Sequence, residues 1–160
     1  MHRNFAQNNH SSQCQCRWSA ELLAKYKIGR KLGGGAYGCV HEGEVYTTGE
    51  PVAIKKIQNI SASATDAKRL LREISLLRMF RGHPTLIGLK YIGTHDSQHF
   101  NEVDLVFERY QTDLAKIIYS SAPLTRDHIE YIFYQMLHGI YSLHATGLVH
   151  RDLKPANILI

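Results

Sequence analysis

A glycine-rich segment between two strand-like segments restricts the folds that this chain can adopt. Gly33, Gly35 and Gly38 have the spacing G-x-G-x-x-G, and Val40 follows them. Glycine permits positive φ angles and lets backbone N–H groups approach phosphate oxygens closely. A dinucleotide-binding fold would need a helix directly after the segment and an acidic residue about 20 positions later. A strand follows instead, which indicates a hairpin, and taken alone the motif also fits a plain glycine-rich hairpin.

Alternating apolar residues and turn signals predict an antiparallel meander around this hairpin. The predicted strands are residues 26–32, 39–46, 51–57, 86–92 and 103–107. Residues 47–50 form the turn between the second and third of them. One helix interrupts the strands and further helices follow them, which is the pattern of an α+β fold with two unequal lobes.

Helical spacing of apolar residues predicts three helices. The first carries Leu70, Leu71, Ile74 and Leu77 on one face, with Ser63 or Thr65 as its N-cap. A short helix is predicted over residues 113–119. The longest begins at Thr125 and ends before Gly147, a typical C-terminal glycine. Its apolar face comprises Ile129, Ile132, Phe133, Met136, Leu137, Ile140 and Leu143.

Composition limits the class of protein and its partners. The chain has 160 residues, enough for one ordinary domain. Residues 1–25, rich in Asn, Gln and Ser near the start, are predicted to be a flexible arm. Lys and Arg exceed Asp and Glu by 19 to 14, and the excess is scattered, so we expect no nucleic-acid partner. No segment is long and apolar enough for a signal peptide or a membrane span, so no membrane partner is expected.

The cysteines favour a reducing compartment. Cys14, Cys16 and Cys39 are too few, and odd in number, for a disulfide framework. We therefore expect a cytoplasmic protein, with the nucleus as an additional location. No second pair with zinc-type spacing follows Cys14 and Cys16, so these two are predicted to be incidental thiols of the arm, and the protein is predicted to hold no metal through them.

Lys55 and Glu73 are predicted to form an ion pair. Lys55 ends the sequence Val-Ala-Ile-Lys on the third strand, where an exposed lysine would be the simplest interpretation. Glu73, however, lies beside Leu70 and Leu77 at the edge of the apolar helix face. A carboxylate there requires a cationic partner. The pair would hold the ammonium group where it can meet phosphate oxygens.

Residues 150–157, His-Arg-Asp-Leu-Lys-Pro-Ala-Asn, carry the most specific signal. Asp152 offers a carboxylate, Lys154 a cation and Asn157 an amide oxygen. Phosphoryl transfer needs a carboxylate that orients the attacking hydroxyl, a cation that offsets phosphate charge, and an oxygen ligand for Mg²⁺. All three roles occur on one loop, downstream of the glycine-rich hairpin.

With these motifs, residues 26–160 resemble the catalytic domain of eukaryotic protein kinases. A lysine two positions after Asp152 is typical of the serine/threonine form. Residues 71–74, 112–114 and 147–150 resemble mitogen-activated protein kinases, and cyclin-dependent kinases are the nearest alternative. The resemblance implies ATP and Mg²⁺ as cofactors, and protein substrates and an upstream activating kinase as partners. It also implies proline-directed phosphorylation.

The resemblance divides the chain and assigns roles within it. It implies an N-lobe at residues 26–107, a hinge at 108–112 and the start of an incomplete helical C-lobe at 113–160. Asp152 would be the catalytic base, Lys154 would contact the γ-phosphate, and Asn157 would bind Mg²⁺. The implied ATP-binding residues are Leu32, Gly33, Gly34, Gly35, Ala36, Tyr37, Gly38, Cys39, Val40, Ala53, Lys55, Glu73, Phe107, Glu108, Tyr110 and Asp113.

Two features depart from the resemblance. Asp104 stands where relatives usually have an apolar residue, so we expect a local difference there. The sequence also ends at Ile160, before the Asp-Phe-Gly motif, the activation loop and most of the C-lobe. We therefore expect residues 1–160 alone to be inactive and prone to aggregate. Either the chain is a fragment of an active kinase, or it is a truncated, pseudokinase-like product that binds nucleotide or competes for partners.

Overall fold

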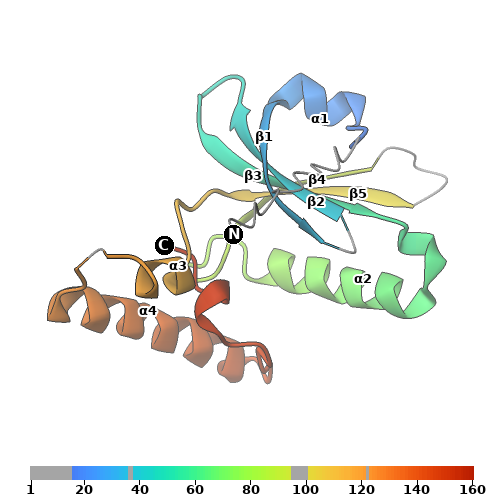
Figure 1. Cartoon of the computed structure of the whole chain (residues 1–160). Coiled ribbons are helices and arrows are strands. Elements are labelled where there is room, and N and C mark those ends of the chain that lie inside the picture. Colours follow the sequence, from blue (N-terminus) through green and yellow to red (C-terminus); the bar gives the residue numbers. More distant parts are fainter. Residues whose placement is uncertain (1–15, 36–37, 95–100, 122) are drawn as a thin grey trace, which may run out of the picture.

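The fold is built on one five-stranded antiparallel sheet (Figure 1). This computed structural model describes residues 16–35, 38–94, 101–121 and 123–160. The strands are β1 (Tyr26–Gly35), β2 (Gly38–Val45), β3 (Pro51–Gln58), β4 (Leu89–Thr94) and β5 (Glu102–Glu108), in the order β1-β2-β3-β5-β4. The predicted α+β class and the five antiparallel strands are confirmed. Cys14, Ala36 and Tyr37 lie outside the described residues.

Two strand boundaries differ by three residues from the sequence prediction, and the other differences are of one or two residues. β1 continues to Gly35, because residues 33–35 pair with Val40, Cys39 and Gly38 of β2. β4 begins at Leu89, three residues later than predicted. The carbonyl oxygen of Gly88 accepts a hydrogen bond from the Glu108 backbone N–H at 3.1 Å, so pairing with β5 begins only there.

Helix α2 (Ala64–Met79) covers one face of the sheet. Its N-cap is Ser63, whose hydroxyl accepts a hydrogen bond from the Asp66 backbone N–H at 3.3 Å. Apolar side chains of α2 and of β3, β4 and β5 form the core on this face: Ile57, Leu70, Leu89, Val103, Leu105 and Phe107, with Ile74 and Leu77 packed against them. The predicted apolar face of the helix therefore packs against the sheet, except for Leu71, which is 64% exposed.

Helix α1 (Ala20–Lys25) covers the opposite face, and here the prediction of a flexible arm to residue 25 is wrong. Leu22 is fully buried against Val52, Ile54 and Val106. One buried residue on a helix of six residues gives no periodic signal, so the sequence did not reveal the helix. Ser19 caps it by accepting the Leu22 backbone N–H at 3.2 Å.

A disulfide fastens the segment before α1 to the sheet. The sulfur atoms of Cys16 and Cys39 are bonded to each other across 23 residues of sequence. The prediction that Cys16 is an incidental thiol is therefore wrong. The side chain of Cys39 is buried on the α1 side of β2, so this residue can reach the opposite face of the sheet only through its backbone.

The unexpected Asp104 forms a buried ion pair on the α1 side of the sheet. Its Oδ1 atom lies 2.9 Å from the ammonium nitrogen of Lys56, and both side chains are fully buried. Glu102 adds a carboxylate 3.1 Å from the same nitrogen, and the ring of Trp18 lies over it at 5.3 Å. Asp104 and Lys56 face each other on β5 and β3, so each supplies the charge that the other requires.

Two helices follow the sheet, α3 (Leu114–Ile118) and α4 (Arg126–Ala145). Asp113 caps α3, and Thr125 caps α4 by accepting the His128 backbone N–H at 3.2 Å. The predicted start of the long helix is confirmed. Among the residues that the structure describes, no helix has the length and apolarity that a membrane crossing requires.

Candidate active site

The predicted pair of Lys55 and Glu73 is present. The Lys55 ammonium donates to Glu73 Oε1 at 2.9 Å, which links β3 to the middle of α2. Both side chains are partly exposed, at 37% and 45%, so the pair is accessible to a solute. Its strength as an isolated contact is modest, because solvent screens it. Its value for a site is geometric, since it fixes the ammonium group of Lys55 over one face of the sheet.

The glycine-rich hairpin lies beside this pair. Val40 on β2 pairs directly with Lys55 on β3, and Gly33 on β1 pairs with Val40. Gly38 has φ +146°, and a Cβ atom there would overlap the carbonyl oxygen of Lys56, so only glycine fits. At Gly33, in contrast, no atom lies within 4 Å of the place that a Cβ would take. The backbone at Gly33 therefore borders open space that a ligand group can occupy.

Three strands carry further residues that the resemblance assigns to ATP binding: β3 with Ala53, β5 with Phe107 and β1 with Leu32. Ala53 lies two positions before Lys55 and on the same face, and it pairs with Phe107. Phe107 is buried in the core beneath α2. Leu32 on β1 remains 45% exposed. Phe107 is thus a core residue whose position also borders the space in front of Ala53.

The connection after β5 is held by polar contacts. Tyr110 donates its hydroxyl hydrogen to Glu108 Oε2 at 3.3 Å, and burial, together with this carboxylate, raises the pKa of Tyr110. Arg109 reaches back to Glu42 on β2, with 3.0 Å between nitrogen and oxygen. These contacts fix the course of residues 108–110 against the sheet.

Asp152, Lys154 and Asn157 lie together on one loop. The Lys154 ammonium lies 3.0 Å from Asp152 Oδ2, and the Asn157 amide donates to the same oxygen at 2.9 Å and to the Asp152 carbonyl at 2.8 Å. The hydrogen bond from Lys154, followed by that from Asn157, lowers the pKa of Asp152. The carboxylate is therefore charged at neutral pH and remains exposed to solvent.

The backbone of this loop has an unusual conformation that the sequence did not reveal. Arg151 has φ +64°, a left-handed conformation that costs a non-glycine residue of order 1 kcal/mol or more. His150 steadies the turn, since its Nδ1 accepts the Asp152 backbone N–H at 3.3 Å. A strained turn that presents a carboxylate is typical of functional loops.

A short antiparallel ladder joins this loop to the start of α3. Thr112 and Ile160 exchange both backbone hydrogen bonds at 3.0 Å, and the Leu114 N–H donates to Ile158 at 2.8 Å. Asp113, one of the ATP-binding residues that the resemblance implies, lies within this ladder. Its carboxylate contacts the Lys116 ammonium at 2.8 Å, and hydrogen bonds from the Lys116 side chain and backbone lower the pKa of Asp113.

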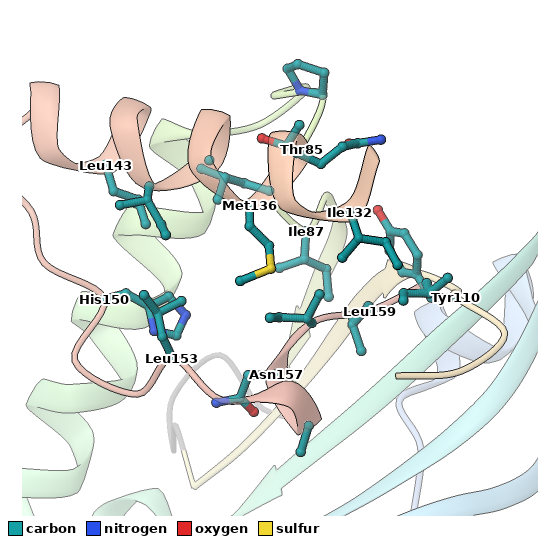
Figure 2. Close-up of a pocket in the computed structure, with 18 of the residues that line it drawn as sticks. Thr85, Ile87, Tyr110, Ile132, Met136, Leu143, His150, Leu153, Asn157 and Leu159 are labelled. Atoms are coloured by element: carbon teal, nitrogen blue, oxygen red, sulfur yellow. The ribbon is translucent and has the colours of Figure 1, made fainter. Parts of the chain in front are cut away.

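A hollow of about 740 Å³ connects the two parts of the site (Figure 2). Glu73 from α2 and Asn157 from the loop both line it, so the helix that holds Lys55 and the loop border a common space. Much of its wall is apolar and comes from α4, with Ile132, Met136 and Leu143 directed inward. One residue from each of the two groups that the sequence singled out separately thus borders the same hollow.

The donors of the loop fit a hard cation. Because the Asn157 Nδ2 group donates twice to Asp152, the amide orientation is fixed and its Oδ1 atom faces away from these bonds. An amide oxygen beside a charged carboxylate is a suitable ligand set for Mg²⁺. The open space at Gly33 and the ammonium of Lys55 similarly fit phosphate groups.

Comparison with known proteins agrees with this arrangement. A family model described as protein kinase domain matches residues 26–160. Mitogen-activated protein kinase 4 of Oryza sativa subsp. japonica is 46% identical over 142 residues, which cover 88% of this chain and 38% of the relative. Extracellular signal-regulated kinase 1 of Dictyostelium discoideum is 47% identical over 137 residues, which cover 85% of this chain and 26% of the relative.

A fungal relative has similar coverage. Mitogen-activated protein kinase mpkA of Aspergillus fumigatus is 43% identical over 136 residues, which cover 85% of this chain and 32% of the relative. The chain therefore spans between about a quarter and two fifths of the length of these three relatives.

Proposed function

The chain belongs to the protein kinase domain family, and we propose that its site takes part in transferring the γ-phosphoryl group of ATP to serine or threonine hydroxyls of protein substrates. One observation carries the proposal: Asn157, which is hydrogen-bonded to Asp152, lines the same hollow as Glu73, the partner of Lys55. The carboxylate of Asp152, the cations of Lys154 and Lys55 and the amide oxygen of Asn157 are the groups that phosphoryl transfer requires.

Each residue of the loop has a defined task in this proposal. The Asp152 carboxylate accepts a hydrogen bond from the substrate hydroxyl and orients its oxygen. Because its pKa is lowered, the Asp152 carboxylate is a weak base. It therefore orients the hydroxyl through the hydrogen bond and takes up the proton only late in the reaction. The Lys154 ammonium stabilises negative charge beside Asp152.

Mg²⁺ and ATP, when bound, supply the electrophilic phosphorus and neutralise charge on its oxygens. Asn157 would hold the cation through its Oδ1 atom. Lys55, positioned by Glu73, would hold the phosphates from the opposite side, and the backbone at Gly33 would cover them.

The class of substrate is proposed from the relatives. Similarity to mitogen-activated protein kinases, at 41–47% identity, supports proline-directed phosphorylation and control by an upstream activating kinase. We expect no transfer by residues 1–160 alone, because within this sequence Asn157 is the sole residue that the family resemblance assigns as a metal ligand.

The first experiment measures nucleotide binding by the 160-residue chain. We expect an ATP analogue to bind in the presence of Mg²⁺, and Lys55→Met to weaken this binding at least about tenfold, since a charge-assisted contact contributes roughly 1.5–3 kcal/mol. Asp152→Asn is the control, because it should leave nucleotide binding nearly unchanged. A folded chain that binds no nucleotide would contradict the proposal.

The second experiment measures transfer. The protein isolated from its own cells should phosphorylate a Ser-Pro or Thr-Pro peptide, and Asp152→Asn introduced in the gene should abolish this activity. Nucleotide binding without transfer by the cellular protein would favour the pseudokinase-like alternative. Robust transfer by purified residues 1–160 would show that our expectation of inactivity is wrong.

A further inference from the structure

Three metal-ligating side chains meet on the α1 side of the sheet, away from the site described above. The Sγ atoms of Cys16 and Cys39 and a ring nitrogen of His41 all lie within 4.8 Å of one another. Cys39 and His41 are two positions apart on β2, so their side chains point to the same face. Cys39 is 1% exposed, and the other two side chains are partly buried. Three soft or borderline donors thus converge in a sheltered place.

The protonation of His41 prepares it to bind a cation. Its Nδ1 lies 3.1 Å from the carbonyl oxygen of Gly29. Because a carbonyl oxygen can only accept, Nδ1 carries the proton in the neutral imidazole, and Nε2 then has the lone pair that a metal ion needs. The Nε2 atom is buried, and it has no hydrogen-bond partner among the described residues. A buried acceptor without a partner is unfavourable, and an imidazole backed by a carbonyl oxygen is the usual arrangement of metal-bound histidines.

We propose that Cys16 and Cys39, in their reduced forms, bind one Zn²⁺ ion together with Nε2 of His41. Thiolates and imidazole are the ligands that zinc prefers. With zinc–sulfur bonds of ~2.3 Å, a tetrahedral ion holds its two sulfur ligands about 3.8 Å apart. The three donors lie within 4.8 Å of one another, so on reduction the two bonded sulfur atoms must move apart and the His41 nitrogen must approach them, each by a shift on the order of 1 Å. Water takes the fourth position.

Binding is coupled to reduction, because the two sulfur atoms are bonded to each other in the structure. A dithiol reductant transfers two electrons and two protons to this disulfide and is itself oxidised to a disulfide. Each of the two thiols then loses its proton as its sulfur coordinates the ion, so one Zn²⁺ replaces two protons. Oxidation and metal binding are thus alternative ways of fastening the segment before α1 to β2.

The chain contains its own reporter for this site. Trp18 is the single tryptophan, and its ring meets that of His41 edge to face with 5.3 Å between centroids. The untagged 160-residue chain is reduced with a phosphine, freed of metal with a chelator and titrated with Co²⁺. We expect one equivalent to produce thiolate-to-cobalt absorption and to quench Trp18 fluorescence. Zn²⁺, which has a closed d shell, should displace Co²⁺ and restore the fluorescence.

Variants distinguish this site from adventitious binding. His41→Gln and Cys16→Ser should each weaken Co²⁺ binding at least about 100-fold, beyond the roughly 10–100-fold loss typical of an outer-shell partner. His144→Gln, an exposed histidine at the end of α4, is the matched control and should bind as the unmodified chain does. Circular dichroism of the metal-free variants confirms folding. If His41→Gln fails to fold, Cys16→Ser still tests the site, because Cys16 precedes α1 and lies outside the sheet.

The proposal is overturned if the reduced chain gives no cobalt absorption, or if all variants bind Co²⁺ equally well. It does not depend on the proposed kinase function, since none of its three ligands takes part in the phosphoryl-transfer site through a side chain.

Discussion

Two neighbouring side chains lower the pKa of Asp152, and this shift can be measured directly. The hydrogen bond from Lys154 is the main cause of its lowered pKa, and that from Asn157 adds to it. We predict that Lys154→Met raises the pKa of Asp152 toward its ordinary value, while Lys154→Arg leaves it low. Titration of the Asp152 carboxyl carbon by NMR measures the difference.

The sign of the accompanying stability effect follows from the same shift. A group whose folded-state pKa is lowered stabilises the fold above its unfolded-state pKa, about 3.9 for aspartate, and this contribution is lost as the pH falls through the folded-state value. Any stability advantage of the unmodified chain over Lys154→Met should therefore vanish in strong acid. An unchanged pKa of Asp152 in Lys154→Met would show that Lys154 does not lower this pKa.

Two glycines of the hairpin differ in what they tolerate. Gly38 has a positive φ, and a Cβ there overlaps the Lys56 backbone, whereas Gly33 faces open space. We predict that Gly38→Ala lowers the free energy of unfolding by roughly 2–3 kcal/mol, or the Tm by about 4–12 °C, and that Gly33→Ala changes it little. Thermal unfolding followed by circular dichroism measures both. Equal effects of the two substitutions would contradict this assignment.

At the scale of elements, the pairing of β3 with β5 contains the buried ion pair of Lys56 and Asp104. We predict that Asp104→Leu alone costs about 3–5 kcal/mol, because it leaves the buried ammonium with Glu102 as its carboxylate partner. The double variant Lys56→Met, Asp104→Leu should recover this loss or exceed it, since apolar replacements of a buried pair are often neutral or stabilising. Unfolding in urea measures the cycle. Additive losses in the double variant would exclude the pairing as the cause.

Local sequence patterns predicted those parts of the fold whose interaction partners can be recognised in the sequence. Glu73 at the edge of an apolar stripe implied a cation nearby, and Lys55 supplies it across 18 residues. Ser63, one of two candidate N-caps, and Thr125, the expected first residue of the long helix, likewise indicated where two helices begin. Helix α1 could not be predicted, because its burial depends on Val106 and its entry on a contact of the Ser19 N–H with Asp104, 85 residues away.

The surroundings of Asp104 were likewise only partly predictable from the sequence. An acidic residue inside an apolar strand indicated a local difference from relatives, but it did not indicate which residue pairs with Asp104. Lys56 follows Lys55 in the sequence, and strand alternation alone places the two lysines on opposite faces. Which of them is buried depends on α1 and Trp18, whose positions no local pattern contains.

Over the whole molecule, the apolar face of α4 is only half covered. Ile132, Met136 and Leu143 line the hollow, whereas Phe133 and Leu137 are 58% and 51% exposed. Burying a large apolar side chain is worth roughly 1.5–3 kcal/mol, so these exposed residues favour association with other apolar surfaces. This agrees with the expectation from the sequence that residues 1–160 alone aggregate.

The exposed half of this face should therefore control self-association. We predict that Phe133→Glu with Leu137→Glu shifts the 160-residue chain toward the monomer in sedimentation velocity, because two charges replace the apolar contact surface. Thr47→Glu with Ser121→Glu is the control, since both positions are exposed and the change in net charge is the same. If the control variant becomes monomeric to the same extent, net charge governs association. If only the α4 variant does, the uncovered helix face is its cause, and this face is the surface that further chain or a partner must cover.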